Sequence, residues 1–137
     1  MLCLNHKTFP FEGNKVKITG AIELRSTNTK FGGLSGLLIT KDFKKTYLVT
    51  DRADFIEADV IMDPQKKNIT CLKNATLRPL RGRSTNPLYG HYADSEGVSF
   101  DKGYKKILVS FERYHRVVTY GLAGRVLLPL KDYKPFD

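Results

Sequence analysis

Apolar and polar residues alternate along the first recognisable element of the chain. From residue 16 to 24, every second position is apolar or small. Side chains of a β-strand point alternately to the two faces of a sheet, so this period of two predicts a strand with one buried face. Short runs rich in β-branched and aromatic residues, bounded by turn residues, predict further strands at 37–40, 46–50, 55–62, 69–72, 75–80, 98–100, 107–111, 117–120 and 126–130.

The helical pattern is missing from the sequence. No window of 11 residues carries the apolar stripe of an amphipathic helix, so the predicted class is all-β. Short strands at even spacing fit a sandwich, a barrel or a propeller, and internal repetition can separate these architectures.

The sequence repeats one unit. Residues 35–52 and 96–113 align without a gap at an offset of 61 positions, and both segments end in an acid followed by arginine. Each unit reads as a β-hairpin: a strand opened by glycine, a lysine-bearing turn and a second strand. Such hairpins cannot cover their own apolar faces and stack in arrays of at least about three, so two units suggest an unfinished array. The identical positions are Gly36/Gly97, Lys41/Lys102, Lys44/Lys105, Lys45/Lys106 and Arg52/Arg113.

Charge and cysteine content narrow the function classes. The net charge of +9 would attract polyanions, but the lysines occur as short pairs spread along the chain. This spread favours solvated turn lysines over a nucleic-acid module, which interleaves basic and aromatic residues. No apolar stretch is long enough for a membrane helix, and His6 and Lys7 stand where a signal peptide would be apolar. Cys3 and Cys71 have no zinc-site spacing; a bridge between them is open but unsupported.

Four motifs carry a resemblance to a known family. They are Phe31–Leu37 (FGGLSGL), Thr50–Arg52 (TDR), Asp94–Val98 (DSEGV) and Ser110–Arg116 (SFERYHR). In this order and spacing they resemble the phytase-like β-propeller domain described as having esterase-like activity of phytase. The resemblance implies a partial β-propeller of two to three antiparallel blades over residues 15–137, with residues 1–14 as an N-terminal extension. The family's domain is about twice as long, so the resemblance implies a truncated chain; full-length relatives are often exported, and the location of this chain stays open.

Carboxylates near the hairpin ends are the candidate chemistry. Strand ends of successive propeller blades converge on a central channel, so Asp51 and Glu112 are expected at equivalent places there. With Asp94 and Glu96 they form a set of oxygen ligands suited to a hard cation such as Ca²⁺, or an acid and base pair. The resemblance implies calcium-assisted hydrolysis of a phosphate or carboxyl ester.

That interpretation assigns roles to individual residues. The expected catalytic residues are Glu96, Glu112 and His115; the expected metal ligands are Asp51, Asp94 and Glu96; and the expected contacts to an anionic ester are Arg52, Arg113 and Arg116. Arginine suits such contacts because its planar fork binds oxyanions in a bidentate manner. The alternative is that each acid–arginine pair is an ion pair between neighbouring strands. The serine in Gly33-Leu34-Ser35-Gly36 lacks the G-x-S-x-G pattern of a serine hydrolase.

Two functional hypotheses therefore remain. One is a hydrolase of the phytase-like family that acts on an anionic small-molecule ester, with calcium as the expected cofactor. The other is a non-catalytic β-repeat module that needs further blades and self-associates through open strand edges. Neither hypothesis involves nucleic acid or a membrane as partner.

Overall fold

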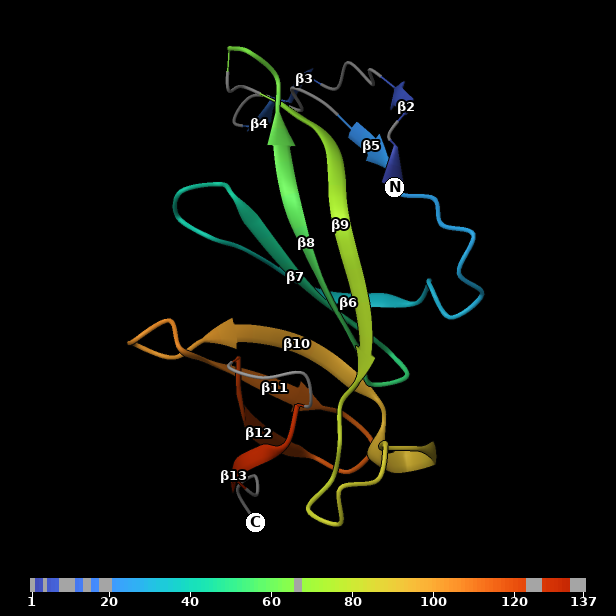
Figure 1. Ribbon diagram of the computed structural model, residues 1–137, viewed down its shortest axis with the longest axis vertical. Coiled ribbons are helices and arrows are strands. Elements are labelled where there is room, and N and C mark those ends of the chain that lie inside the picture. The colour runs from blue at the N-terminus through green and yellow to red at the C-terminus, as the bar shows by residue number, and fades with distance from the viewer. Residues whose placement is uncertain are drawn as a thin grey trace.

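The computed structural model describes residues 2–3, 5–7, 12–13, 16–17, 21–65, 68–122 and 127–133 of the chain. Two antiparallel sheets dominate it, one above the other in Figure 1. The first sheet has the order β1 (Leu2–Cys3), β9 (Ile69–Pro79), β8 (Asp54–Met62), β7 (Lys45–Thr50) and β6 (Leu34–Ile39). The second has the order β10 (Ser95–Phe100), β11 (Lys106–Phe111), β12 (Arg116–Gly121) and β13 (Pro129–Tyr133).

Two small strand pairs and one short helix complete the described elements. β2 (Asn5–Lys7) pairs with β5 (Ala21–Glu23), and β3 (Glu12–Gly13) pairs with β4 (Val16–Lys17). The helix in the described residues is a single 3₁₀ turn, η1 (Gly90–Tyr92), and no described helix has the length and apolar character to cross a membrane. The all-β prediction is confirmed, and the two antiparallel sheets are consistent with a partial β-propeller. We call the sheet that contains β6–β9 the first blade and the sheet β10–β13 the second blade.

The predicted duplication is confirmed in three dimensions. The hairpins β6–β7 and β10–β11 have the same strand limits at an offset of 61 residues. Each carries a bulge after the first residue of its first strand, at Leu34/Gly36 and at Ser95/Gly97. In each turn an aromatic residue occupies the left-handed region, Phe43 with φ 55° and its counterpart with φ 56° at Tyr104.

The two hairpins differ in the turn that follows them. β8 starts at Asp54, three residues after the acid Asp51, whereas β12 starts at Arg116, four residues after Glu112. The extra residue explains why the gapless sequence match stops at Arg113. It lengthens the turn that carries the second acid–arginine pair.

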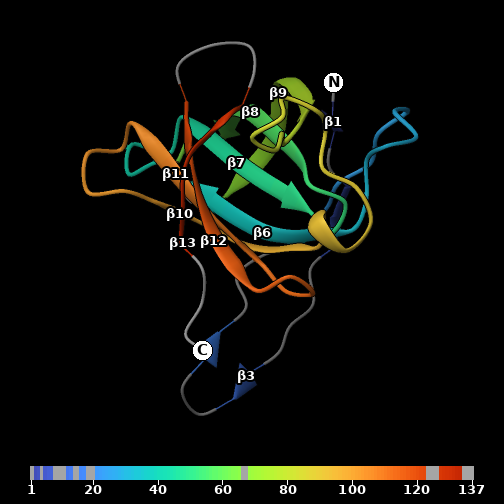
Figure 2. The same cartoon turned by 90° about the horizontal axis from the view of Figure 1, so that it is seen from below.

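The main core lies between the two sheets, with β6 and β10 side by side in Figure 2. Tyr47 stacks on Phe55 at 5.7 Å between ring centroids and meets the edge of Phe100 of the second sheet at 5.5 Å. A second cluster covers the other face of the first sheet. The buried members of the main core are Tyr47, Val49, Ala53, Phe55, Leu80, Ala93, Ile107, Val109, Phe111, Val118, Tyr120 and Leu127, and those of the second cluster are Leu48, Ile56, Ala58, Val60 and Leu72.

Some predicted strand limits were wrong. Residues 69–79 form one strand, not two, because the Asn74 backbone adopts φ 51° within the strand and a bulge at Glu57/Asp59 of β8 lets pairing continue. The predicted strand 16–24 is described only as β4 and β5, since residues 18–20 lie outside the described residues, as does residue 126 of the last predicted strand. A register pair places Cys3 opposite Cys71, so residues of the expected N-terminal extension pair with the first sheet.

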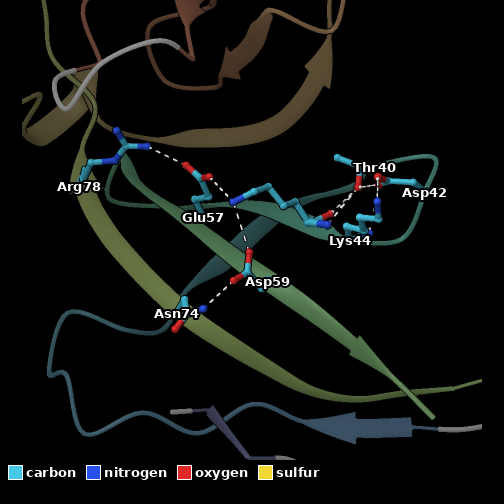
Figure 3. A network of polar contacts seen from close by, with 8 residues as sticks. Thr40, Asp42, Lys44, Glu57, Asp59, Asn74 and Arg78 are labelled. Carbon is cyan, nitrogen blue, oxygen red and sulfur yellow. Dashed lines mark hydrogen bonds and ion pairs between the residues drawn. The ribbon is translucent and has the colours of Figure 1, made fainter. Parts of the chain in front are cut away.

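Polar residues cover the outer part of the first sheet, beyond the aromatic core (Figure 3). The Lys45 ammonium lies 2.9 Å from Glu57 and 3.3 Å from Asp59. Glu57 also accepts a bond from Arg78, and Asn74 donates to Asp59 at 2.7 Å. The Asn74 amide, and then the Lys45 ammonium, hold the pKa of the Asp59 carboxyl below its usual range. The network joins β7, β8 and β9, so it fixes the sheet that the second blade packs against.

Gly36 of β6 sets how closely the two blades approach. A Cβ at this position would lie 2.8 Å from a methyl group of Val49 and 3.0 Å from the backbone nitrogen of Val98. Gly36→Ala should therefore push the blades apart and lower the free energy of unfolding by about 2 kcal/mol, as overpacking does. Urea denaturation checks this value. The matched control is Gly103→Ala, whose Cβ would approach only Asp101, at 3.8 Å; an equal loss in the control would contradict the steric reason.

Candidate active site

Three of the predicted carboxylates converge at one end of the second sheet. One oxygen each of Asp94, Glu96 and Glu112 lies within 4.8 Å of the other two. Asp94 and Glu96 flank the first residue of β10, and Glu112 follows the last residue of β11. The two segments are adjacent because the Glu112 amide donates to the Asp94 carbonyl at 2.9 Å.

The start of β10 brings Asp94 and Glu96 together. Asp94 precedes the strand and Glu96 is its second residue, and their side chains point the same way, since the two carboxylates approach within 4.8 Å of each other. Ser95, which lies between them, is fully buried on the opposite side. The bulge at Ser95/Gly97 leaves Glu96 outside the regular pairing with β11, which frees its side chain for the exposed cluster.

Two serine hydroxyls tie this acidic segment to the first blade. Ser95 Oγ donates to the Thr50 carbonyl at 2.5 Å, and Ser35 Oγ donates in return to the Ser95 carbonyl. Ser95, between the two acids, is thus bonded through both its hydroxyl and its carbonyl to the β6–β7 hairpin, at the start of β6 and the end of β7. Packing of the two blades therefore positions the carboxylates.

A guanidinium offsets part of the negative charge. Arg113 Nε lies 2.8 Å from Asp94 Oδ2, and the Arg113 side chain is 64% exposed against 18% for Asp94. Three carboxylates and one guanidinium leave a local excess of negative charge. The carboxylates repel one another, and a bound cation would reduce this repulsion. An exposed set of carboxylate oxygens can bind a hard cation or exchange protons with a substrate.

The first acid–arginine pair lies outside this cluster. Asp51 is half exposed, and its carboxylate is 3.8 Å from Arg52 Nε. Arg52 also donates to the carbonyls of Lys30 (3.1 Å) and Gly32 (3.3 Å), so it holds the chain that leads into β6. His115 lies exposed in the turn between β11 and β12 that also carries Glu112.

Arg116 is a buried cation, only 8% exposed. Its guanidinium lies 3.9 Å from the centroid of the Phe111 ring and donates to the carbonyls of Tyr114 (3.0 Å) and Tyr92 (2.5 Å). These bonds join the two segments that lead to the carboxylates: Tyr92 precedes Asp94, and Tyr114 follows Glu112. Arg116 therefore helps to hold the two segments that carry the carboxylates at a fixed separation.

A protein-family model tests the resemblance that the four motifs indicated. The model described as phytase-like, with esterase-like activity of phytase, matches residues 29–136. The chain belongs to the phytase-like family. No curated protein and no solved structure matches it. The matched segment contains every predicted site residue of this phytase-like chain.

Sequence reasoning predicted the three acids that the structure brings together, but it missed the contacts that hold them. The equivalents of Asp94 and Glu96 in the first hairpin are Gly33 and Ser35, so the same position beside Asp51 carries no second carboxylate. Ser35 instead supplies the hydroxyl that anchors the second hairpin. A comparison of the two repeats position by position could have shown this difference, but the contact between the two serines needs the fold.

Proposed function

We propose that this phytase-like chain is a hydrolase of anionic esters and that Asp94, Glu96 and Glu112 form its reactive centre. The convergence of their oxygens within 4.8 Å is the observation that carries the proposal. Family membership supports the reaction class, and the net charge of +9 favours an anionic substrate. We extend the two blades to a propeller whose central channel holds this centre.

The donor set suits calcium. Calcium binds oxygen ligands at about 2.3–2.6 Å, so two ligands on opposite sides of the ion lie about 5 Å apart, which the 4.8 Å separation accommodates. Asp94 and Glu96 are the proposed ligands. When bound, the ion would neutralise charge on the ester and on the attacking oxygen.

The proposed roles of Glu112, Arg113 and His115 follow from their exposure to solvent and their position next to the two ligands. Glu112 is exposed beside the two ligands and acts as the general base that takes a proton from the attacking water. Arg113, with most of its side chain exposed, contacts the anionic group of the ester while Asp94 orients it. His115, on the same turn, protonates the leaving group.

An assay of ester hydrolysis with and without calcium tests the proposal. We expect the chain to release 4-nitrophenol in millimolar Ca²⁺, and to do so faster from the anionic 4-nitrophenyl phosphate than from the neutral 4-nitrophenyl acetate. Addition of EGTA should lower the rate at least about tenfold, since the ion supplies several kcal/mol of charge stabilisation. A rate no higher than that of buffer on both esters, with calcium present, would contradict the proposal.

One observation favours a second candidate function, a non-catalytic module that pairs with further blades. Apolar side chains remain exposed on both sheets, among them Leu37 of β6 (59%) and Leu130 of β13 (58%). β13 also ends its sheet, and an edge strand offers its backbone groups to another strand. Analytical ultracentrifugation separates the candidates: association that rises with concentration, without turnover, supports the module, whereas a monomer that hydrolyses esters refutes it.

A further inference from the structure

The turns of the two duplicated hairpins lie next to each other. Residues 40–44 connect β6 to β7, and residues 101–105 connect β10 to β11. The Lys41 ammonium lies 5.0 Å from the centroid of the Tyr104 ring, so the two turns are in contact. Both turns form the outermost points of the described chain on the left of Figure 1 and Figure 2. We call residues 40–44 and 101–105 together the paired tips, and a flat surface can touch both of them at once.

The paired tips have an excess of positive charge. They contain four lysines and two aspartates, and all four lysines are exposed. Equivalent lysines of the two tips are 61 positions apart in the sequence, so only the fold brings them to one side of the molecule. The lysines are Lys41, Lys44, Lys102 and Lys105.

The two aspartates of the tips are used within the turns. Asp42 accepts hydrogen bonds from the Thr40 hydroxyl at 2.6 Å and from the Lys44 amide at 3.1 Å. Asp101 accepts bonds from two backbone amides that follow it in the same hairpin, both at 3.1 Å. The Lys44 ammonium also lies 3.7 Å from Asp42, but an ion pair that is exposed to this extent contributes little. The ammonium groups of the tips therefore remain accessible to an anion outside the protein.

Each tip also presents an aromatic side chain at a position that is costly for it. Phe43 (φ 55°) and Tyr104 (φ 56°) occupy the left-handed region, which glycine and asparagine tolerate best in such turns. Phe43 is 55% exposed and Tyr104 is 48% exposed, so the core does not require these rings. A strained backbone that exposes an aromatic ring to water points to a contact of the ring outside the protein.

Lysines around a protruding aromatic ring fit the surface of an anionic bilayer. Ammonium groups bind the lipid headgroups, while the ring enters the boundary between headgroups and acyl chains. A single-stranded nucleic acid fits less well, because it follows a groove and stacks its bases on open ring faces. The tips protrude, and the Tyr104 ring already contacts Lys41 and, at 5.2 Å between ring centroids, Phe100. The observations therefore favour a bilayer.

We propose that the paired tips bind a bilayer that contains anionic phospholipids, with Phe43 and Tyr104 in the headgroup region and the lysines against the lipid phosphates. The sequence did not predict this partner, because its lysine pairs are spread along the chain. The candidate active site lies at the other ends of β10 and β11, so it stays open to solvent in the bound state. The inference goes beyond the proposed function and holds whether or not the carboxylates hydrolyse an ester.

Sedimentation with sucrose-loaded vesicles tests this surface. We expect vesicles of phosphatidylcholine with about 30% phosphatidylserine to bind the chain at least about tenfold more tightly than vesicles of phosphatidylcholine alone, because each lysine near an anionic surface contributes. Raising the salt concentration from about 0.1 M to about 0.5 M should reverse most of this difference, since salt screens exposed charges. Equal binding to both vesicles would overturn the proposal. Tighter binding to a single-stranded oligothymidylate than to the anionic vesicles would overturn it as well.

Two matched double variants assign the binding to the tips. Lys44→Gln with Lys105→Gln removes one charge from each tip and should weaken binding to the anionic vesicles at least about tenfold, since one lysine near the surface contributes roughly fivefold. The matched control is Lys30→Gln with Lys73→Gln, which removes the same charge from exposed positions before β6 and on β9. An equal loss in the control is incompatible with the proposal. Hydrolysis of soluble esters should be the same in both double variants, so failure of membrane binding and failure of the proposed hydrolase are distinguishable.

A tryptophan reporter shows whether the ring enters the bilayer. The chain contains no tryptophan, so Phe43→Trp introduces a single fluorophore at one tip. Its emission should shift to shorter wavelength on the anionic vesicles. The matched control is Tyr89→Trp, because Tyr89 is 78% exposed and directly precedes η1, which lies on the other side of the molecule from the tips in Figure 1. No shift for Phe43→Trp, or an equal shift for both variants, would refute insertion at the tips and with it the proposal.

Discussion

Glu112→Gln is expected to lower the turnover number of ester hydrolysis by at least about 100-fold, since a positioned general base contributes roughly 10²–10⁴. Gln keeps the size of the side chain but cannot take a proton from water. The Glu112 backbone amide, which donates to Asp94, is unaffected by the change. Steady-state rates on 4-nitrophenyl phosphate and 4-nitrophenyl acetate, measured in calcium, give the ratio.

The control for this change is Glu23→Gln, the same substitution at a partly exposed carboxylate on β5 that pairs with Arg25. It should alter the rate less than about twofold, because exposed ion pairs contribute little and Glu23 is not part of the cluster. Thermal unfolding of both variants shows that they are folded. If Glu112→Gln retains the full rate, Glu112 is not the base and another group must take the proton.

Much of the fold could be predicted because the determining patterns are local. The strands were predicted from short apolar runs that are bounded by turn residues. The two equivalent hairpins were predicted from the repeat at an offset of 61 residues. Bulges and interruptions were harder to predict, since they depend on the partner strand. Asn74 shows why. An asparagine between two short apolar runs indicates a turn in the sequence, yet its backbone adopts φ 51° within β9, and β8 accommodates it with a bulge of its own.

The candidate site was predicted in part for a similar reason. Repeat symmetry placed Asp51 and Glu112 at equivalent turns, and the structure confirms this equivalence: the amide of each donates to the residue before the first strand, Gly33 or Asp94. Symmetry cannot show which turn gathers other acids, because that depends on the residue across the turn. A glycine faces Asp51, whereas a carboxylate faces Glu112. The arginines behave likewise, since each also contacts a segment that is remote in sequence: Lys30 and Gly32 for Arg52, Asp94 for Arg113 and Tyr92 for Arg116.

The blades share one core, so the carboxylates depend on residues far from them. The Thr50 carbonyl at the end of β7 accepts the hydrogen bond from the hydroxyl of Ser95, which lies between Asp94 and Glu96. β7 is in turn held by the aromatic contacts between the sheets. Loss of those contacts would release the acidic segment even where no site residue is changed.

Phe55→Ala is therefore expected to be the most damaging single change for stability, with a loss of about 3–5 kcal/mol in the free energy of unfolding. The Phe55 ring is fully buried in the core between the sheets, where it stacks on Tyr47 and lies 5.5 Å from the Arg78 guanidinium. Its removal leaves a cavity that rigid neighbouring strands cannot fill. Since the free energy of unfolding of small domains is only about 5–15 kcal/mol, this change would remove a large part of it.

Urea denaturation followed by circular dichroism measures this loss, and Phe43→Ala is the matched control. Phe43 is 55% exposed at the tip of the β6–β7 turn, so its truncation should cost less than about 1 kcal/mol. A loss in Phe55→Ala no larger than in this control would show that the two sheets do not share a cooperative core. The carboxylates would then be positioned by the β10–β11 hairpin alone, and Ser95→Ala, which breaks the bond to Thr50, should leave hydrolysis unchanged.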